Sequence, residues 1–224
     1  MEVKHRMTPN PITATPTTTH REAVQLMKDH QISRLPILDK SGKLVGIVTG
    51  EDLHNAEPSK ATTLSVYEIV SLLDKMQLKE IMSSPVLAVQ EDCSLTRAAQ
   101  FMIENRVNAL PVMQGEKLIG IITEADIFKT VVEVMGGGEP GFRVEIEVEN
   151  RVGSLANVCK AFTDIGSSII ALTTFRGSDS STGVISIKER GADEAELREM
   201  LDGLECVKIL TIRPNKQDEL LKFG

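Results

Sequence analysis

A threonine and an aspartate stand three residues apart at two equivalent places in the chain. Thr49 and Asp52 belong to the first Gly-x-x-Thr-x-x-Asp motif, and Thr123 and Asp126 belong to the second. A threonine hydroxyl beside the free N–H groups of a helix start can hold a phosphate oxygen. An aspartate can accept hydrogen bonds from the vicinal hydroxyls of a ribose. The alternative interpretation is an ordinary N-cap, with the aspartate as a favourable charge in the first helical turn.

The two motifs belong to a tandem repeat. Three residues of the first copy return 75 positions later: Met7 as Met82, Ala23 as Ala98, and Pro36 as Pro111. Asp52 returns after 74 positions as Asp126, because the turn of the first copy is one residue longer. Turns tolerate such a change, whereas strand registers do not. The chain therefore contains one fold unit twice, which favours two related small-molecule sites over a single catalytic centre.

Each repeat must place its motif where a strand gives way to a helix. In the first copy, Thr19 begins a capping box, and short apolar strands are expected over 35–38 and 44–48. In the second copy Ser94 caps the equivalent helix, with a weaker cap because Arg97 replaces the glutamate of the box. Between the copies, helical apolar spacing over 64–76 predicts a helix that packs across the pair.

The glycine-rich run 136–141 separates this pair from a further unit, because three consecutive glycines and a proline continue neither helix nor strand cheaply. Alternating polarity then predicts a half-buried strand over 142–149. The remaining expected elements are a helix over 154–166, strands over 169–175 and 183–188, a helix over 193–201 and a strand over 207–212. The order βαββαβ is that of a ferredoxin-like domain, so the fold class is α/β (α+β).

The composition limits the classes of function. The formal net charge is −7 and aromatic residues make up 3%, so a general nucleic-acid or anionic-membrane binder is not expected. No apolar run approaches the ~20 residues that span a bilayer, and the first residues lack the apolar core of a signal peptide. The three cysteines Cys93, Cys159 and Cys206 form no metal or redox pattern, as in proteins of a reducing compartment. A cytoplasmic location is expected.

Several motifs, taken in order, resemble the CBS domain. The first set comprises Met7 to Thr13, Ser33-Arg34-Leu35-Pro36-Ile37 and Gly46 to Asp52, and the second comprises Met82 to Pro85, Asn108 to Val112 and Gly120 to Asp126. The resemblance implies a CBS pair, or Bateman module, that dimerises and binds adenosine-type ligands such as AMP, ADP, ATP or S-adenosylmethionine. It implies that Asp52 and Asp126 hold ribose and that Thr49 and Thr123 hold phosphates. It also implies a base pocket lined by the backbone of Ile12 and Thr13, and of Val86 and Leu87.

One departure from equal repeats concerns a basic side chain. Arg34 occupies a place where the family often has a phosphate-contacting base, but its counterpart is Ala109. Arginine supplies a fixed charge and a fork of donors, whereas alanine supplies neither. We expect unequal sites, with the cleft served by Arg34 favouring the more anionic ligand. The alternative is a solvated surface arginine.

The second unit resembles an ACT domain, through the run Glu149 to Leu155 between its first strand and helix. That resemblance implies amino-acid binding by this loop, at Asn150, Val152 and Gly153. Val152 replaces the proline common in that loop, and Asn150 replaces the aspartate often found at its start. The alternative is an ACT fold that serves only for dimerisation.

The predicted organisation is a CBS pair over 1–134, a linker over 135–141, an ACT-like domain over 142–213 and a tail over 214–224. The pair itself consists of repeats over about 1–58 and 76–134, joined by a helical connector over 59–75. Nearly the whole chain resembles the AcuB-type proteins linked to acetoin utilisation.

No catalytic motif is found, and the four histidines fit no metal template, so neither an enzyme nor a catalytic cofactor is expected. The predicted function is ligand sensing by a cytoplasmic homodimer, which signals nucleotide occupancy, and amino-acid occupancy of the ACT unit, to an unidentified regulated protein. No nucleic-acid or membrane partner is expected. The alternatives are a constitutive interaction scaffold without ligand and a weak enzyme acting on adenine nucleotides.

Overall fold

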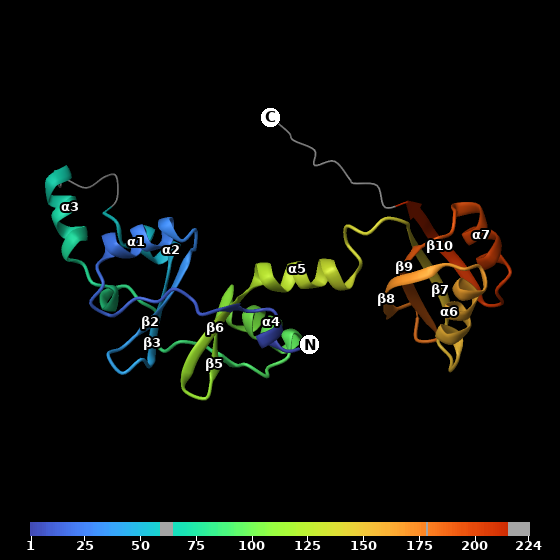
Figure 1. Cartoon of the computed structure of the whole chain (residues 1–224), viewed down its shortest axis with the longest axis horizontal. Coiled ribbons are helices and arrows are strands. Elements are labelled where there is room, and N and C mark those ends of the chain that lie inside the picture. Colours follow the sequence, from blue (N-terminus) through green and yellow to red (C-terminus); the bar gives the residue numbers. More distant parts are fainter. Residues whose placement is uncertain (59–64, 178, 215–224) are drawn as a thin grey trace. The chain divides into compact units, whose positions relative to one another are not determined.

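The computed structural model describes residues 1–58, 65–177 and 179–214, apart from the side chain of Val66. Contacts divide the chain into two compact units, Met1–Phe128 and Lys129–Gly224. Each unit is described by itself below (Figure 1). One helix, α5 (Glu124–Val134), begins in the first unit and ends in the second.

The first unit holds the two repeats, and each contains a helix, a two-stranded hairpin and a second helix. In the first repeat these are α1 (His20–Asp29), β2 (Arg34–Leu38), β3 (Leu44–Thr49) and α2 (Gly50–Ala56). In the second repeat they are α4 (Leu95–Asn105), β5 (Ala109–Gln114), β6 (Lys117–Thr123) and α5. Two short elements lead each repeat: η1 (Val3–His5) and β1 (Thr8–Pro9) come before α1, and η2 (Leu78–Glu80) and β4 (Val89–Gln90) come before α4.

The caps of the first helices follow the prediction. Thr19 forms a reciprocal capping box with Glu22 at the start of α1. At the start of α4 the Ser94 hydroxyl accepts a hydrogen bond from the Arg97 N–H at 3.2 Å, and no reciprocal bond from a carboxylate completes the box. Each hairpin then packs on its own apolar cluster, around Leu35 and Ile37 in the first repeat and around Leu110 and Val112 in the second.

The segment that precedes each repeat contacts the strands of the other repeat. β1 pairs antiparallel with β6, with Thr8 opposite Ile121. Ser83 forms a bridge with Ile47 in β3. The methionines that precede these residues pack over glycines, because a Cβ at Gly120 would collide with Met7 and a Cβ at Gly46 would collide with Met82. The two repeats are therefore held together by reciprocal exchange of their leading segments.

The connecting helix α3 (Val66–Lys75) forms as predicted, whereas residues 59–64 of the connector lie outside the described part of the chain. α3 packs on α1 of the first repeat rather than across the pair. An ion pair of 3.2 Å joins Arg21 of α1 to Asp74 of α3, and Tyr67 is 89% exposed. The apolar spacing of this segment predicted the helix correctly but not its partner.

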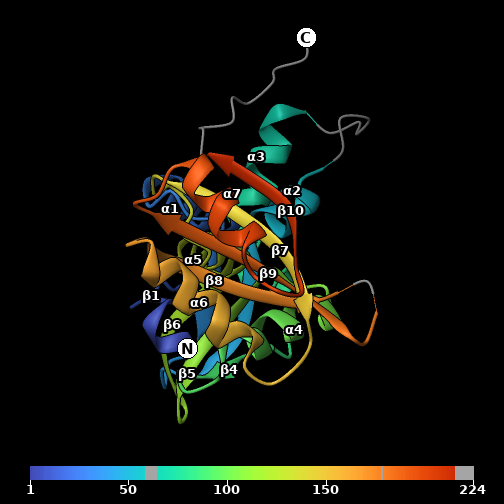
Figure 2. The same cartoon turned by 90° about the vertical axis from the view of Figure 1, so that its right-hand side faces the viewer.

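The second unit has the predicted βαββαβ order. Its elements are β7 (Phe142–Glu149), α6 (Ser154–Asp164), β8 (Ser168–Arg176), β9 (Thr182–Arg190), α7 (Glu194–Asp202) and β10 (Val207–Pro214). The sheet is antiparallel with the order β10-β7-β9-β8. α6 and α7 cover one face of the sheet (Figure 2). On this face Phe162, Leu197 and Leu201 pack on strand residues such as Ile146 and Ile187. This arrangement is the ferredoxin-like plan expected for the α/β fold class.

None of the helices formed by the described residues is long and apolar enough to cross a membrane.

Candidate functional site

A cavity of about 400 Å³ opens between the two repeats of the first unit. The first repeat and the segment leading to the second contribute the strand-to-helix junction, with Ser33, Arg34, Ile47, Thr49, Gly50, Glu51, Asp52 and Ser83. The second repeat contributes the run Arg106 to Ala109. The cavity lies within the volume range of about 300–1,000 Å³ that small-molecule sites occupy. The structure thus brings together three of the predicted site residues, Arg34, Thr49 and Asp52.

Thr49 and Asp52 form a reciprocal capping box at the start of α2. The Thr49 N–H and hydroxyl each donate to Asp52 Oδ2 at 2.8 Å, and the Asp52 N–H donates to Thr49 Oγ1 at 3.1 Å. These are the contacts that the N-cap interpretation predicts, and they use one oxygen of the Asp52 carboxylate, Oδ2. Among the described residues, none donates to the other oxygen, Oδ1. Asp52 keeps an acceptor in the cavity lining while its side chain is held in place.

Thr123 and Asp126 repeat this geometry at the start of α5. The Thr123 N–H and hydroxyl donate to Asp126 Oδ2 at 2.9 and 2.7 Å, and the Asp126 N–H donates to Thr123 Oγ1 at 3.3 Å. The two motifs are thus equivalent in local structure as well as in sequence. Because Ala109 takes the place of Arg34 in this repeat, the second junction lacks the equivalent cation.

Arg34 connects the two repeats across the cavity. Its Nε donates to Asn108 Oδ1 at 3.0 Å, and its Nη1 donates to Ser33 Oγ at 2.9 Å. Both partners are neutral, and no carboxylate of a described residue pairs with this guanidinium. Arg34 is only partly exposed, so it is not the fully solvated surface arginine of the alternative interpretation.

Arg106 is a second cation of the same cavity that the sequence analysis did not identify. It caps the C-terminus of α4 in the left-handed conformation, with a φ of 55°. The repeat offset equates it with Gln31, which also has a positive φ of 52°. The cavity at Thr49 and Asp52 therefore has two arginines, one from each repeat. Comparing position 31 with position 106 would have revealed the asymmetry, because a ligand between repeats contacts residues of both.

The four predicted base-pocket residues do not line this cavity. Ile12 and Thr13 precede Ala14, which forms a parallel bridge with Ile37. Val86 and Leu87 precede β4, and Leu87 is exposed. All four lie outside helices and strands. Ile12 and Thr13 lie between β1, which pairs with β6 of the second repeat, and the bridge of Ala14 to Ile37 in the first repeat. Val86 and Leu87 lie between the bridge of Ser83 to Ile47 in the first repeat and β4, which pairs with β5 of the second repeat.

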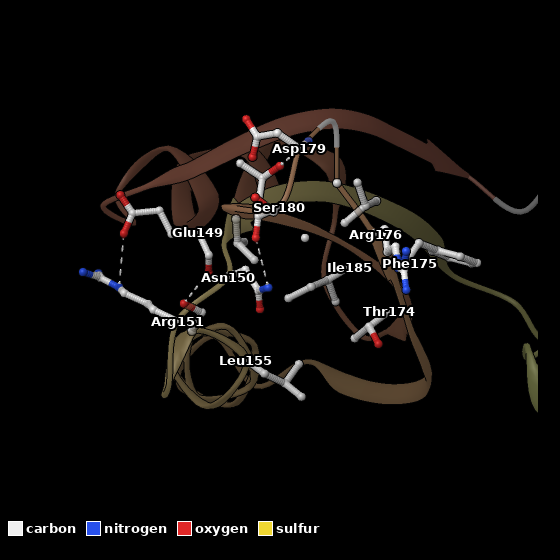
Figure 3. A pocket seen from close by; sticks show the side chains of 16 residues that line it. Glu149, Asn150, Arg151, Leu155, Thr174, Phe175, Arg176, Asp179, Ser180 and Ile185 are labelled. Carbon is white, nitrogen blue, oxygen red and sulfur yellow. Dashed lines mark hydrogen bonds and ion pairs between the residues drawn. The ribbon is translucent and has the colours of Figure 1, made fainter.

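A larger cavity, of about 770 Å³, lies in the second unit between the β7–α6 loop and the β8–β9 hairpin (Figure 3). Asn150 lines it and is fixed to the hairpin, since its backbone N–H donates to the Ser181 carbonyl at 2.7 Å and its Nδ2 to the Ser180 carbonyl at 3.5 Å. Val152 and Gly153 do not line this cavity. Val152 is fully exposed, and Gly153 precedes α6 with a φ of 95°, a conformation that favours glycine.

The lining of this second cavity combines both charges with apolar side chains. Arg151 pairs with Glu149 at 3.4 Å, and Arg176 and Phe175 come from β8 (Figure 3). Hydrogen bonds from Ser181 hold the pKa of the Asp179 carboxyl below its usual value. A site with these groups can receive a small molecule that carries both an anionic and a cationic group.

No cluster of three or more metal-ligating side chains occurs among the described residues. The three cysteines are free thiols, and burial raises the pKa of Cys93.

Comparison with known proteins identifies the family of the first unit. The model of the CBS domain matches residues 2–58 and 78–133, which together make up half of the chain. The chain belongs to the CBS-domain family. The two matches coincide with the two repeats, and the cavity at Thr49 and Asp52 is the cleft of a CBS pair.

Similar proteins share this CBS pair. The inosine-5'-monophosphate dehydrogenase of Methanocaldococcus jannaschii is 37% identical over 120 residues, which are 53% of this chain and 21% of that enzyme. CBSX2 in complex with AMP is 26% identical, with a TM-score of 0.50 over 59% of this chain and 97% of that chain. A Vibrio cholerae protein given the name AcuB, for acetoin utilization, is 32% identical, with a TM-score of 0.49 over 59% of this chain and 90% of that chain.

The chain spans only part of its curated relatives, 21% of that dehydrogenase and 38% of the uncharacterized M. jannaschii protein MJ1404. The match to the dehydrogenase covers 53% of this chain, and the match to MJ1404 covers 74% of it.

Proposed function

We propose that the chain is a regulatory protein that senses an adenosine-type nucleotide, AMP, ADP, ATP or S-adenosylmethionine, in the cleft of its CBS pair. The observation that carries the proposal is the cavity between the repeats, which is lined by the fixed carboxylate of Asp52, by Glu51, and by two arginines that pair with no carboxylate of the described residues. The AMP complex of CBSX2, a chain of the same fold, supports the ligand class. Among these ligands, AMP is the first to test.

Different lining residues are proposed to contact the ribose and the phosphate of the ligand. Asp52 Oδ1 is the acceptor for the ribose hydroxyls, since Oδ2 is already used in the cap. Arg34 and Arg106 form the phosphate end, where guanidinium groups give charge-assisted hydrogen bonds. Thr49 donates both its N–H and its hydroxyl to Asp52, so its proposed part is to fix that carboxylate beside the ligand. The proposed base contacts with the backbone of residues 12–13 and 86–87 require the ligand to extend beyond the lining of this cavity, which includes none of these residues.

We propose a second, less basic site at Thr123 and Asp126. The capping geometry there is the same, but Ala109 replaces Arg34 and Gln31 replaces Arg106. At these two positions the first site has two positive charges that the second lacks. The site at Asp52 should prefer the more anionic ligand, and the site at Asp126 a less charged one.

The second unit is proposed to be an ACT-like domain that binds an amino acid in the cavity of about 770 Å³. Asn150, which lines this cavity, is the proposed contact for such a ligand. Val152 and Gly153 shape the loop at its edge, so their proposed contribution is through loop conformation.

Ligand occupancy would reach an unidentified partner by favouring one packing of the repeats, and such couplings are typically ~1–3 kcal/mol. The proposal includes a homodimer in the cytoplasm without catalytic activity. A role in acetoin metabolism, as in AcuB-type proteins, is part of the proposal.

One observation favours a different function, a constitutive scaffold without ligand. Both Thr-Asp motifs satisfy their own backbone as capping boxes. A ligand is not needed to explain why a helix begins at either motif.

Calorimetric titration of AMP into the full chain distinguishes the two functions. Asp52→Asn preserves an acceptor for the Thr49 N–H but removes the charge, so the cap survives while the ribose contact weakens. Hydrogen bonds to charged groups contribute about 1.5–3 kcal/mol, which corresponds to at least a tenfold weaker affinity. Asp126→Asn is the matched variant of the other site. Absence of AMP binding to the wild-type chain would favour the scaffold.

A further inference from the structure

A buried lysine without a hydrogen-bond partner lies on the sheet face of the second unit that α6 and α7 leave uncovered. Lys188 of β9 is 0% exposed, and its Nζ makes no hydrogen bond to any described residue. Burial lowers the pKa of the Lys188 ammonium, and the nearby Arg143 guanidinium lowers it further. A buried polar group without a partner is costly, and in native proteins it points to a ligand, an ion or a water.

The strand register places three more polar side chains around this amine. Arg143 of β7 stands directly opposite Lys188. Ser186 precedes Lys188 by two residues and therefore lies on the same face of β9. Thr173 of β8 stands opposite Ser186, and its buried Oγ1 also has no hydrogen-bond partner among the described residues. The four side chains form a cluster over three neighbouring strands, here called the open-face cluster.

The open-face cluster is rich in donors and poor in acceptors. Arg143 Nη1 donates to Ser186 Oγ at 3.4 Å, and Arg143 Nη2 donates to the Met135 carbonyl at 2.7 Å. The nearest carboxylate in sequence register is Glu145, opposite Ser186, and none of its contacts described here joins it to Lys188 or Arg143. The charges of Glu189 and Glu139 act on Lys188 in the opposite sense, but each is a smaller influence on its pKa than burial and Arg143. The Glu189 carboxylate accepts hydrogen bonds from the Phe142 N–H and the Ser167 hydroxyl, and Glu139 pairs with Arg190 at 4.0 Å.

The turn that follows α5 covers the open-face cluster. Gly136, with a φ of 68°, passes so close that a Cβ there would lie 2.9 Å from Lys188 Cγ. The hydrogen bond from Arg143 to the Met135 carbonyl holds the same turn. A ligand of the amine would therefore sit beneath this turn and displace the Met135 carbonyl or share Arg143 with it.

We infer that the open-face cluster is a binding site for one oxyanion group, a carboxylate or a phosphate of a small ligand. Two cations and two hydroxyls with few acceptors among them suit such a group, because each oxygen of an oxyanion accepts several charge-assisted hydrogen bonds. The site is separate from the CBS cleft and shares no residue with the cavity beside Asn150.

The test uses the full chain labelled with ¹⁵N and titrated with sodium phosphate, and separately with sodium acetate, at constant ionic strength. The backbone amide signals of Thr173, Ser186 and Lys188 should shift and saturate. Saturation by phosphate or by acetate tells which oxyanion the site prefers. Lys188→Met should abolish the saturable shifts. Lys208→Met is the matched control, because it removes an exposed lysine from β10 of the same sheet, and it should leave the shifts unchanged.

Two further variants keep the inference falsifiable. If Lys188→Met fails to fold, Thr173→Val removes one unpartnered hydroxyl with little change of shape and should weaken the saturable shifts. Asp52→Asn changes only the CBS cleft and should leave these shifts intact. The oxyanion site can therefore be confirmed or refuted whether or not the CBS cleft binds a nucleotide. Absence of saturable shifts in the wild-type chain, or the same shifts in Lys188→Met, would overturn the inference. The Lys188 amine would then be satisfied by a water molecule and not by an oxyanion.

Discussion

Replacing Arg34 by alanine tests whether the cleft of the CBS pair recognises the phosphate of a nucleotide. Within the described part of the chain, Arg34 donates to two neutral groups, Asn108 Oδ1 at 3.0 Å and Ser33 Oγ at 2.9 Å. A phosphate would give it an anionic partner, and a hydrogen bond to a charged group contributes about 1.5–3 kcal/mol. Because the cleft is open to solvent, the lower end of this range applies. AMP affinity should therefore fall about tenfold.

The assay compares AMP with adenosine by calorimetric titration of the same proteins. Adenosine has the ribose and the base but no phosphate, so Arg34→Ala should leave its affinity unchanged. Asn108→Ala is the matched control, since it breaks the same hydrogen bond between the repeats but retains the guanidinium. AMP should bind Asn108→Ala at least as tightly as it binds the wild-type chain.

Equal losses for AMP and adenosine in Arg34→Ala would refute this reasoning. They would mean that Arg34 acts by holding the two repeats together through Asn108 and has no direct contact with the ligand. Unchanged AMP affinity would refute it as well, because an unneutralised cation in a nucleotide site must contribute to phosphate binding.

Three further predictions concern stability. Gly120→Ala should lower the free energy of unfolding by about 1–3 kcal/mol, because its Cβ collides with Met7; an unchanged urea midpoint would contradict the exchanged packing. Ser94→Ala should cost about 1 kcal/mol in the same assay, since it removes the cap of α4, and no loss would mean that solvent replaces the cap. Because the lowered pKa of Lys188 makes the folded state bind fewer protons than the unfolded state, stability should rise with pH between that pKa and the ordinary lysine value. When the free energy of unfolding is measured against pH, Lys188→Met should show a smaller increase than the wild-type chain. An equal increase in the variant would mean that other titrating groups cause it.

The sequence was sufficient for the features that depend on local pattern. The repeat offset located both hairpins, and the alternation over 142–149 located β7 with its observed bounds. The capping residues Thr19 and Ser94 marked the starts of α1 and α4. Each of these features follows from side chains within one turn or one strand, so neighbouring residues determine it.

The features that the sequence did not reveal depend on contacts between distant segments. The pairing of the two-residue strand β1 with β6 has no local pattern. The place of Arg106 in the cleft depends on the other repeat, and the partner of α3 depends on which exposed surface accepts its apolar side. Lys188 follows the strand alternation as an ordinary outward-facing residue, and only the turn at Gly136 shows that it is buried.

A crystal structure of the full chain grown with AMP tests the central claim most directly. The account predicts nucleotide in the cleft between the repeats, with ribose hydroxyls donating to Asp52 Oδ1 and the phosphate beside Arg34 and Arg106. The capping box of Thr49 should remain in place. A cleft that stays without nucleotide at saturating AMP, with Asp52 bound only to its own helix start, would contradict the account.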